Sequence, residues 1–361
     1  MKATHLLPFL AVTLFAALAF SARAERTVVY VSNGGSKDIS LFDLNPASGE
    51  LTARGVVALE GNPGPLAISP DRKFLYAALR QGKSVQTLRV NPADGSLTAA
   101  GTVVTNVNPA YLIVDRTGRN LLAADYGGDR VTVHRIAPDG TVEATPVSDI
   151  ATGRNPHSIL TDRENRFVFS PLCGADKVLQ FRFDPATGKL AANEPADVGF
   201  QPVDGPRHMT FHPTKPFAYV VNEKSSSMTA LAYDAGKGTL KPLQTLPTLP
   251  QDFAAKNSCA DIHITPDGKY VYGSNRGHDS LAGYAIDQAT GKLTSLGQTP
   301  TEKTPRSFAI DPTGKFIFAA GQGSHRLASY RIDSATGALH ALKTYETGQG
   351  PAWVLVVQLS K

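Results

Sequence analysis

Short apolar segments joined by tight turns recur along this chain of 361 residues. In the first of two alternating patterns, an apolar strand is followed by a turn and a second apolar strand, as in HMTFHPTKPFAYVVN at 208–222. The turns are rich in Asp, Pro and Gly, which tolerate the backbone angles of a tight reversal. Further copies of this pattern lie at 65–79, 111–125, 158–172, 261–275 and 307–321.

The second pattern is an alternating strand followed by a turn and a further strand, as in KVLQFRFDPATGKL at 177–190. One anchor residue stands just before the first strand of each repeat and makes the period measurable. These anchors are Pro63, Pro109, Pro156, Pro206, Cys259, Pro305 and Pro351, with spacings of 46, 47, 50, 53, 46 and 46 residues. Four strands per repeat, a period in the forties and seven copies are typical of a β-propeller.

The two ends of the chain complete one another. The last repeat, at 351–359, has an inner strand without later partners, whereas 27–59 supplies three strands that lack an inner one. Together they form a single four-stranded blade and leave no unpaired edge at the seam. The sequence therefore predicts an all-β fold, a seven-bladed β-propeller whose last blade is closed by strands from both chain ends. The predicted domain covers 25–361.

Residues 1–24 have the pattern of a cleavable signal peptide. Lys2 gives a positive start, Leu6–Phe20 is apolar, and Ala22-Arg23-Ala24 has the small-x-small form that precedes a cleavage site. The apolar run is too short to span a membrane comfortably. We therefore expect a periplasmic or secreted domain that is not membrane-bound once the signal is cleaved. The alternative for this segment is a buried N-terminal helix.

Charge and cysteine content narrow the function classes. Removal of 1–24 lowers the net charge from +5 to +3, and no Lys/Arg cluster is present, which argues against nucleic acid as a partner. The two cysteines, Cys173 and Cys259, fall in blades 3 and 5 with blade 4 between them, so we expect free thiols. We expect a monomer or a weak dimer.

Strand period and hairpin topology place two rings of residues at one mouth of the central channel. Residues that enter the first strand and residues that leave the second lie on the same face of the disc, because these strands are antiparallel. The first ring is Gly64, Ala110, His157, Arg207, Ala260, Arg306 and Ala352. The second is Gly34, Arg80, Tyr126, Cys173, Glu223, Arg276 and Gln322.

Charged and imidazole groups interrupt these rings in blades 3 to 6. His157, Arg207 and Arg306 break a ring of mostly small residues, and Glu223 and Arg276 stand beside them. Several like charges on one arc indicate an anionic ligand, and guanidinium groups can hold a carboxylate or a phosphate bidentately. Possible additional substrate contacts are His208, Arg306, Gln322, Asp261 and His263.

The histidines outside this arc favour ordinary packing or surface positions. His212 is expected at the turns of the opposite face, and His278 in a loop. His263 alternates with two isoleucines and so faces the channel together with Asp261. A substrate contact and a hydrogen-bonded core histidine are equally open for it.

The motifs resemble the seven-bladed lactonase family typified by the propeller-type bacterial 6-phosphogluconolactonase, which also includes the fungal carboxymuconate-lactonising enzyme. The resemblance covers essentially all of 27–359. It is carried by GPRHMTFHP at 205–213, VVNE at 220–223, ADIHITPDG at 260–268, SNRGHDS at 274–280, TPRSFAIDPTGKF at 304–316, AAGQGSH at 319–325 and TGQGPAWVLV at 347–356. Residue by residue, it implies that His157, Arg207, Glu223 and Arg276 are the catalytic and substrate-binding groups.

The leading hypothesis is hydrolysis of a small anionic, sugar-derived lactone without a cofactor or metal. His157 is the expected general base because an imidazole titrates near neutral pH. Glu223 either orients His157 and the arginines or acts as the base itself. Arg207 and Arg276 are expected to hold the anionic group and to stabilise the developing oxyanion.

Three alternatives remain open at this point. The first is a cycloisomerase that forms a lactone from a muconate-type dicarboxylate, with the arginines as carboxylate clamps. The second is a propeller that binds a ligand or a protein without catalysis, since a fold does not fix function. The third is a calcium-dependent lactonase with Glu223, Asn222 and Asn275 as oxygen ligands, which the basic character of the cluster disfavours.

The connection at 242–258 precedes blade 5 on the same face of the disc, and we expect it to cover the site.

Overall fold

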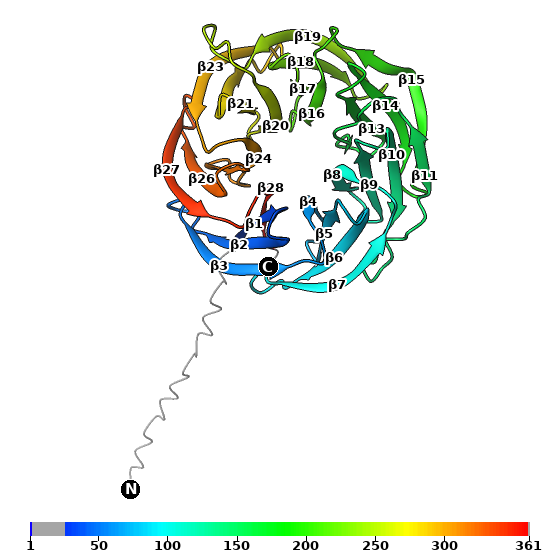
Figure 1. Ribbon diagram of the computed structural model, residues 1–361, viewed down its shortest axis with the longest axis vertical. Coiled ribbons are helices and arrows are strands. Elements are labelled where there is room, and N and C mark those ends of the chain that lie inside the picture. Colours follow the sequence, from blue (N-terminus) through cyan, green and yellow to red (C-terminus); the bar gives the residue numbers. More distant parts are fainter. Residues whose placement is uncertain (2–25, 360–361) are drawn as a thin grey trace.

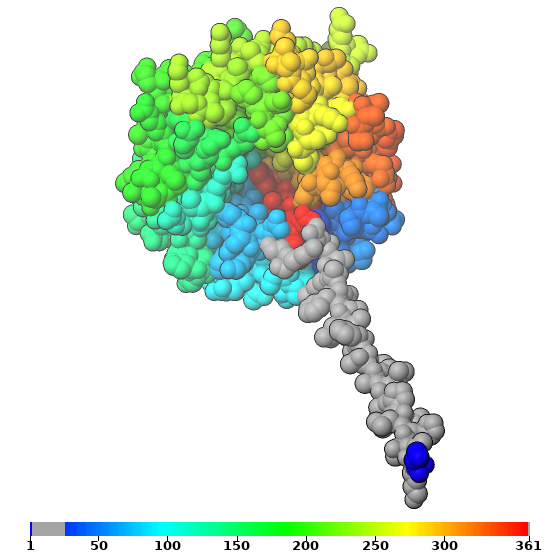
Figure 2. Space-filling view, turned by 180° about the vertical axis from the view of Figure 1, so that it is seen from behind, coloured from blue at the N-terminus to red at the C-terminus, as the bar shows by residue number. Residues whose placement is uncertain are grey.

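Seven four-stranded antiparallel sheets are arranged in a ring, with the first strand of each blade innermost (Figure 1). The computed structural model describes residue 1 and residues 26–359, so the predicted signal peptide lies, Met1 aside, outside the described residues. Among these residues, no helix is long and apolar enough to cross a membrane. The space-filling view from behind shows the disc hollowed at its centre, with the C-terminal strand visible in the hollow (Figure 2).

Blades 1 to 6 each run from an inner to an outer strand in chain order. Blades 1 and 2 comprise β4 (Pro63–Ile68), β5 (Phe74–Leu79), β6 (Ser84–Val90) and β7 (Leu97–Val104), then β8 (Pro109–Val114), β9 (Asn120–Asp125), β10 (Arg130–Arg135) and β11 (Ser148–Ala151). Blades 3 and 4 comprise β12 (Leu160–Thr161), β13 (Phe167–Leu172), β14 (Lys177–Asp184) and β15 (Lys189–Gly199), then β16 (Pro206–Phe211), β17 (Phe217–Asn222), β18 (Ser227–Asp234) and β19 (Thr239–Pro247).

The remaining blades confirm the predicted closure. Blades 5 and 6 comprise β20 (Ser258–Ile264), β21 (Tyr270–Arg276), β22 (Ser280–Ile286) and β23 (Leu293–Pro300), then β24 (Pro305–Ile310), β25 (Phe316–Gly321), β26 (Arg326–Ile332) and β27 (Leu339–Glu346). Blade 7 has β28 (Pro351–Gln358) as its inner strand, followed by β1 (Thr27–Asn33), β2 (Asp38–Leu44) and β3 (Leu51–Ala58). Seven residue pairs between β1 and β28 join the two ends, from Thr27–Gln358 to Asn33–Pro351, with a register shift between Ser32 and Asn33.

The hydrophobic core lies between neighbouring blades. Second strands such as β9 and β17 are buried along their whole length because a blade packs against each of their faces. Buried tyrosines in four second strands also donate a hydrogen bond to a turn carbonyl of the following blade, as in Tyr272 Oη to Gly337 O at 2.8 Å. Apolar packing and these repeated bonds hold the blades in a fixed order around the channel.

Two segments differ from the sequence-based expectation. The first strand of blade 3, expected from residue 158, is regular only over Leu160–Thr161. Its partner strand contains Pro171, which has no N–H to donate to the inner strand, and the carbonyl of Ser158 accepts a hydrogen bond from Ser170 Oγ instead. The expected cover at 242–258 is in its first half the outer strand β19, and none of this connection lines the central cavity described below.

Candidate functional site

Bulges in the inner strands turn the first-ring residues toward the channel. The ladder between β16 and β17 shifts register between Pro206 and His208, so Arg207 has no partner across the hairpin. The equivalent shift between β24 and β25 leaves out Arg306. A bulge of this kind bends the strand and re-aims a side chain, which is why bulges are frequent beside functional sites.

The carboxylate of Glu223 lies between two guanidinium groups. Arg207 Nε donates to Glu223 Oε2 at 3.0 Å, and Arg276 Nη2 donates to Glu223 Oε1 at 2.9 Å. The thiol of Cys173 lies 3.6 Å from Oε2. Burial alone would raise the pKa of Glu223, but Arg207 and Arg276 outweigh it and lower that pKa below its usual value. Glu223 is therefore an ionised group whose two oxygens are both engaged.

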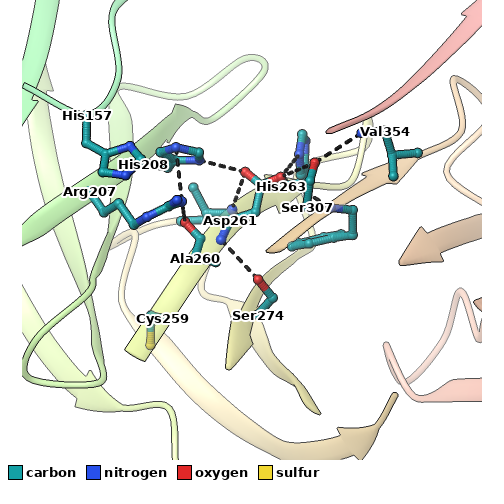
Figure 3. A network of polar contacts seen from close by, with 12 residues as sticks. His157, Arg207, His208, Cys259, Ala260, Asp261, His263, Ser274, Ser307 and Val354 are labelled. Carbon is teal, nitrogen blue, oxygen red and sulfur yellow. Dashed lines mark hydrogen bonds and ion pairs between the residues drawn. The ribbon is translucent and has the colours of Figure 1, made fainter. Parts of the chain in front are cut away.

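Arg207 is held from the other side by a chain of polar contacts (Figure 3). Its side chain is 1% exposed, and its Nη1 contacts the carbonyl oxygen of Ala260 and lies 3.1 Å from His208 Nε2. His208 Nδ1 is 2.8 Å from Asp261 Oδ1. Because a guanidinium can only donate, Nε2 of His208 must accept, and the proton on Nδ1 points to Asp261. Asp261 thus fixes the tautomer of His208, and His208 fixes the direction of Arg207.

Asp261 ties this chain to the neighbouring blade. Its Oδ2 accepts hydrogen bonds from Ser307 Oγ at 3.0 Å and from the backbone N–H of Phe308 at 3.2 Å, and it lies 3.3 Å from His263 Nε2. Although burial acts to raise the pKa of Asp261, the His263 and His208 contacts hold it well below its usual value. Asp261 is buried and does not line the cavity; it contacts His208, which does.

His157 packs into the same cluster as a neutral ring. Its Nε2 lies 4.0 Å from Glu223 Oε2, and its ring makes edge contacts with Tyr126 and His208 at centroid distances of 5.1 and 5.2 Å. Burial, reinforced by Arg207, lowers the pKa of His157 well below its usual value. Its buried Nδ1 has no hydrogen-bond partner among the described residues. The His157 ring is thus uncharged at neutral pH, and no neighbouring group occupies its Nδ1.

A cavity of about 460 Å³ opens at this mouth, within the size range of small-molecule sites. Members of both predicted rings line it. Its charged and polar lining includes Arg80, Arg207, His208, Arg306 and Gln322, with Trp353 as the large apolar side chain. His157, Glu223 and Arg276 do not line it directly; they lie beside it and are linked to it through Arg207.

Two residues that line the cavity were not assigned to the site from the sequence: Arg80, a member of the second ring, and Trp353, which directly follows the first-ring residue Ala352. Arg80 occupies the same ring position as Glu223 and Arg276, so the signal that singled out those residues applied to it equally. Trp353 adjoins Tyr111 and His208 at centroid distances of 5.0 and 6.0 Å and forms a wall of the cavity. The arc of polar groups therefore extends beyond blades 3 to 6 to blade 1, and blade 7 contributes an apolar wall.

The remaining predictions concern metal ligands, thiols and His212. Among the described residues, no three His, Cys, Asp or Glu side chains are grouped as metal ligands would be. The oxygens of Glu223 face guanidinium groups, and Asn275 Oδ1 accepts from Thr248 within the blade, so this donor set does not suit calcium. The two cysteines are free, as expected, and both are buried.

His212 lies in the turn between β16 and β17, where its Nδ1 accepts hydrogen bonds from the backbone N–H groups of residues 214 and 215.

Because several histidines are buried, the free energy of unfolding is expected to fall in mild acid. Burial and Arg207 lower the pKa of His208 to about 3, and His134, His157 and His212 shift in the same direction. Below about pH 6.5 the unfolded chain binds protons that the folded chain does not, so each such histidine removes up to about 1.4 kcal/mol of stability per pH unit until the pH reaches its folded pKa. Urea unfolding at pH 7.5, 6.0 and 5.0 measures this slope.

Two variants test whether the pH dependence of the free energy of unfolding arises at the site. His208→Gln removes one contributor and should reduce the pH dependence, even though it lowers stability at every pH. His340→Gln, at an exposed position on β27, serves as the matched control and should leave the slope as it is. Equal slopes in all three proteins would contradict a neutral His208 in the folded state.

Comparisons with known proteins agree with this architecture. A family model described as lactonase, 7-bladed beta-propeller, matches residues 27–356. A 6-phosphogluconolactonase of Pectobacterium carotovorum is 38% identical over 332 residues, which cover 92% of this chain and 99% of that protein. A 6-phosphogluconolactonase of an Enterobacter species is 37% identical over 331 residues, with 92% and 99% covered.

A solved structure shows the same ring of blades. The periplasmic gluconolactonase of Pseudomonas aeruginosa superimposes with a TM-score of 0.86 at 28% sequence identity, over 93% of this chain and all of that one. The family match and the curated relatives extend across nearly the whole propeller, including the residues of the Glu223 cluster. The chain therefore belongs to the seven-bladed β-propeller lactonase family.

Proposed function

We propose that this protein hydrolyses a sugar-derived lactone, 6-phosphogluconolactone or a related aldonolactone, to the open-chain acid. Relatives named 6-phosphogluconolactonase and gluconolactonase support the substrate class. The observation that carries the proposal is a carboxylate clamped between Arg207 and Arg276 at the edge of a cavity large enough for a sugar lactone. No cofactor takes part in the proposed reaction.

The paired guanidinium groups stabilise the charge that forms during ring opening. When water attacks the carbonyl carbon, negative charge develops on the carbonyl oxygen, and donors already in place lower the barrier most. Glu223 holds Arg207 and Arg276 in fixed positions before substrate arrives, so neither guanidinium must reorient during the reaction. In this proposal, both arginines direct remaining N–H groups toward the carbonyl oxygen.

His157 takes the proton from the attacking water and returns it to the ring oxygen as the ester bond breaks. It is neutral at working pH, because burial and the positive charge of Arg207 lower its pKa. A base of low pKa is weak, but it remains available at mildly acidic pH as well. Glu223 orients the cluster; its own basicity is reduced because both of its oxygens accept hydrogen bonds from arginine.

Turnover of δ-lactones by the purified mature chain tests the proposal. The wild type should hydrolyse δ-gluconolactone or its 6-phosphate faster than the spontaneous reaction. Arg207→Ala should lower kcat/KM by about a hundredfold or more, because it removes an oxyanion donor. Arg326→Ala is the matched control, since Arg326 is half exposed and pairs with Glu346 on the outer part of blade 6. Unchanged turnover in Arg207→Ala would overturn the role proposed for that residue.

Turnover of unsaturated diacids and ligand binding test the two rival functions. Incubation with unsaturated diacids, followed at the diene absorbance, detects the lactone-forming cycloisomerase. A propeller that only binds its ligand would turn over neither the lactones nor the diacids, and its binding would survive His157→Ala and Glu223→Ala. Rapid hydrolysis of a lactone by the wild type excludes the non-catalytic alternative directly.

We also propose a periplasmic location. The predicted signal peptide at 1–24 supports export, and the related Pseudomonas gluconolactonase is named as a periplasmic protein. Cell fractionation with an antibody to the mature domain tests this, together with N-terminal sequencing of the exported form, which should begin at Glu25. Recovery of the full-length chain in the cytoplasm alone would contradict it.

A further inference from the structure

The four arginines at the channel mouth fall into two pairs with different surroundings. Arg207 and Arg276 are both neutralised by Glu223. Among the described residues, no side chain or carbonyl lies within hydrogen-bond or ion-pair distance of the Arg306 guanidinium, and the Arg80 side chain donates only through Nε, to Asn108 Oδ1 at 3.0 Å. Both guanidinium groups line the cavity, and the carboxylates that act on them, Glu223 for Arg306 and Asp125 for Arg80, do so without a direct ion pair.

Both of these arginines are partly buried rather than free in solvent. Burial is the main reason that the pKa of Arg306 falls to about 9, and the positive charges of Arg207, Arg276 and Arg80 add to it. Burial also lowers the pKa of Arg80. A desolvated and repelled cation is costly unless an anion accompanies it, so these two groups are prepared for a negatively charged ligand.

The backbone around Arg80 is adapted to its position. A Cβ atom on Gly64 would lie 2.7 Å from Arg80 Cδ and 3.0 Å from its Cγ. The arginine side chain therefore passes directly over the inner strand β4, and only a glycine at residue 64 leaves room for it. Gln322, from blade 6, lines the same cavity as an additional hydrogen-bonding group.

We infer that Arg80 and Arg306 form the subsite for the anionic group of the substrate, a phosphate or a carboxylate, while Arg207 and Arg276 serve the reacting carbonyl. This revises the expectation that Arg207 and Arg276 hold the anion, because Glu223 already occupies them. The substrate then lies across the cavity with its charged end over blades 1 and 6 and its lactone carbonyl toward Glu223. The lactone itself rests on the proposed function, but the anion subsite does not.

Binding of simple anions tests the subsite without any turnover. Trp353 is the sole tryptophan of the chain and lines the cavity, so its fluorescence can follow titrations with inorganic phosphate and with glucuronate, whose carboxylate is at the opposite end of the sugar from the lactone carbon. Arg80→Gln and Arg306→Gln should each weaken binding of the preferred anion by about ten- to a hundredfold, the usual range for a charge-assisted hydrogen bond. Arg326→Gln, at a half-exposed position, should not.

Kinetics with a matched substrate pair test the orientation. The ratio of kcat/KM for 6-phosphogluconolactone to that for plain gluconolactone should fall in Arg306→Gln if the anion is a phosphate. A loss of glucuronate binding with an unchanged ratio assigns the subsite to a carboxylate. Gly64→Ala keeps the charge but displaces Arg80, and should reproduce part of the Arg80→Gln effect.

The outcomes distinguish the subsite from the function. If the wild type binds neither anion, or if Arg80→Gln, Arg306→Gln and Arg326→Gln bind equally well, the inference is overturned. If anion binding depends on Arg80 and Arg306 but no lactone is hydrolysed, the subsite stands and the proposed function fails.

Discussion

Glu223→Gln is expected to lower both the activity and the stability of this protein more than any other single change at the site. The substitution removes one negative charge from between Arg207 and Arg276, so two guanidinium groups are left facing each other. Arg207 is only 1% exposed, so water reaches its guanidinium poorly, although Glu223 itself is 23% exposed. Removing one partner of a fully buried ion pair typically costs about 3–5 kcal/mol, and the partial exposure of Glu223 places the expected loss of stability at the lower end of that range.

The kinetic effect has a related origin. Without Glu223, repulsion drives Arg207 and Arg276 apart, and the donors for the carbonyl oxygen are no longer preorganised. A loss of about 10²- to 10³-fold in kcat is expected, comparable to removal of one oxyanion donor. Lactone hydrolysis and urea unfolding of the same preparation measure the two effects together.

Controls separate charge from shape. Glu346, an exposed residue on β27, pairs with Arg326 on β26, so Glu346→Gln should change neither kcat nor the free energy of unfolding. Glu223→Asp keeps the charge and should recover part of the stability, although the shorter side chain cannot reach both arginines equally well. If Glu223→Gln unfolds like Glu346→Gln and retains wild-type kcat, Glu223 does not balance the arginine pair.

The fold was predictable because the propeller repeats itself. Anchor residues with a period near 46 and a final repeat without partners were sufficient to predict seven blades and the closure by β28 and β1. Blade 3 departs from the pattern because of a local cause, the missing N–H of Pro171, which a search for repeated strand patterns does not weigh.

The site was predictable as a ring but not as a set of contacts. Strand register places Arg207, Glu223 and Arg276 on one face, yet it cannot show that one carboxylate serves two guanidinium groups. Position in the sequence also cannot separate a group at a surface from one behind it, so Asp261 was expected to contact substrate. Its partner in the structure is His208, 53 residues away in the chain.

Asp261→Asn is expected to lower kcat although Asp261 does not line the cavity. In the folded protein, both carboxylate oxygens accept hydrogen bonds: Oδ1 from His208 Nδ1 and the backbone N–H of Ile262, and Oδ2 from Ser307 Oγ and the backbone N–H of Phe308. An amide has one oxygen and one NH₂ group, so one side must face donor to donor. If the NH₂ group faces His208, its Nδ1 can no longer carry the proton.

The consequence for Arg207 follows from the tautomer. With the proton on Nε2, His208 presents a donor to Arg207 Nη1, which is also a donor, and the 3.1 Å contact is lost. Arg207 then keeps Glu223 and the carbonyl of Ala260 but loses its lateral support. Loss of a hydrogen bond to a charged group is worth about 1.5–3 kcal/mol, so kcat should fall about ten- to a hundredfold.

The tautomer of His208 distinguishes a positioning role of Asp261 from a merely structural one. In ¹⁵N-labelled protein, the ring nitrogen shifts of His208 should show the proton on Nδ1 in the wild type and on Nε2 in Asp261→Asn. Asp197→Asn, which affects a surface pair with Lys177, is the matched control and should show the wild-type pattern. A fall in thermal stability without a tautomer change would mean that Asp261 only joins blades 5 and 6. A changed tautomer with unchanged kcat would mean that Arg207 keeps its direction without His208.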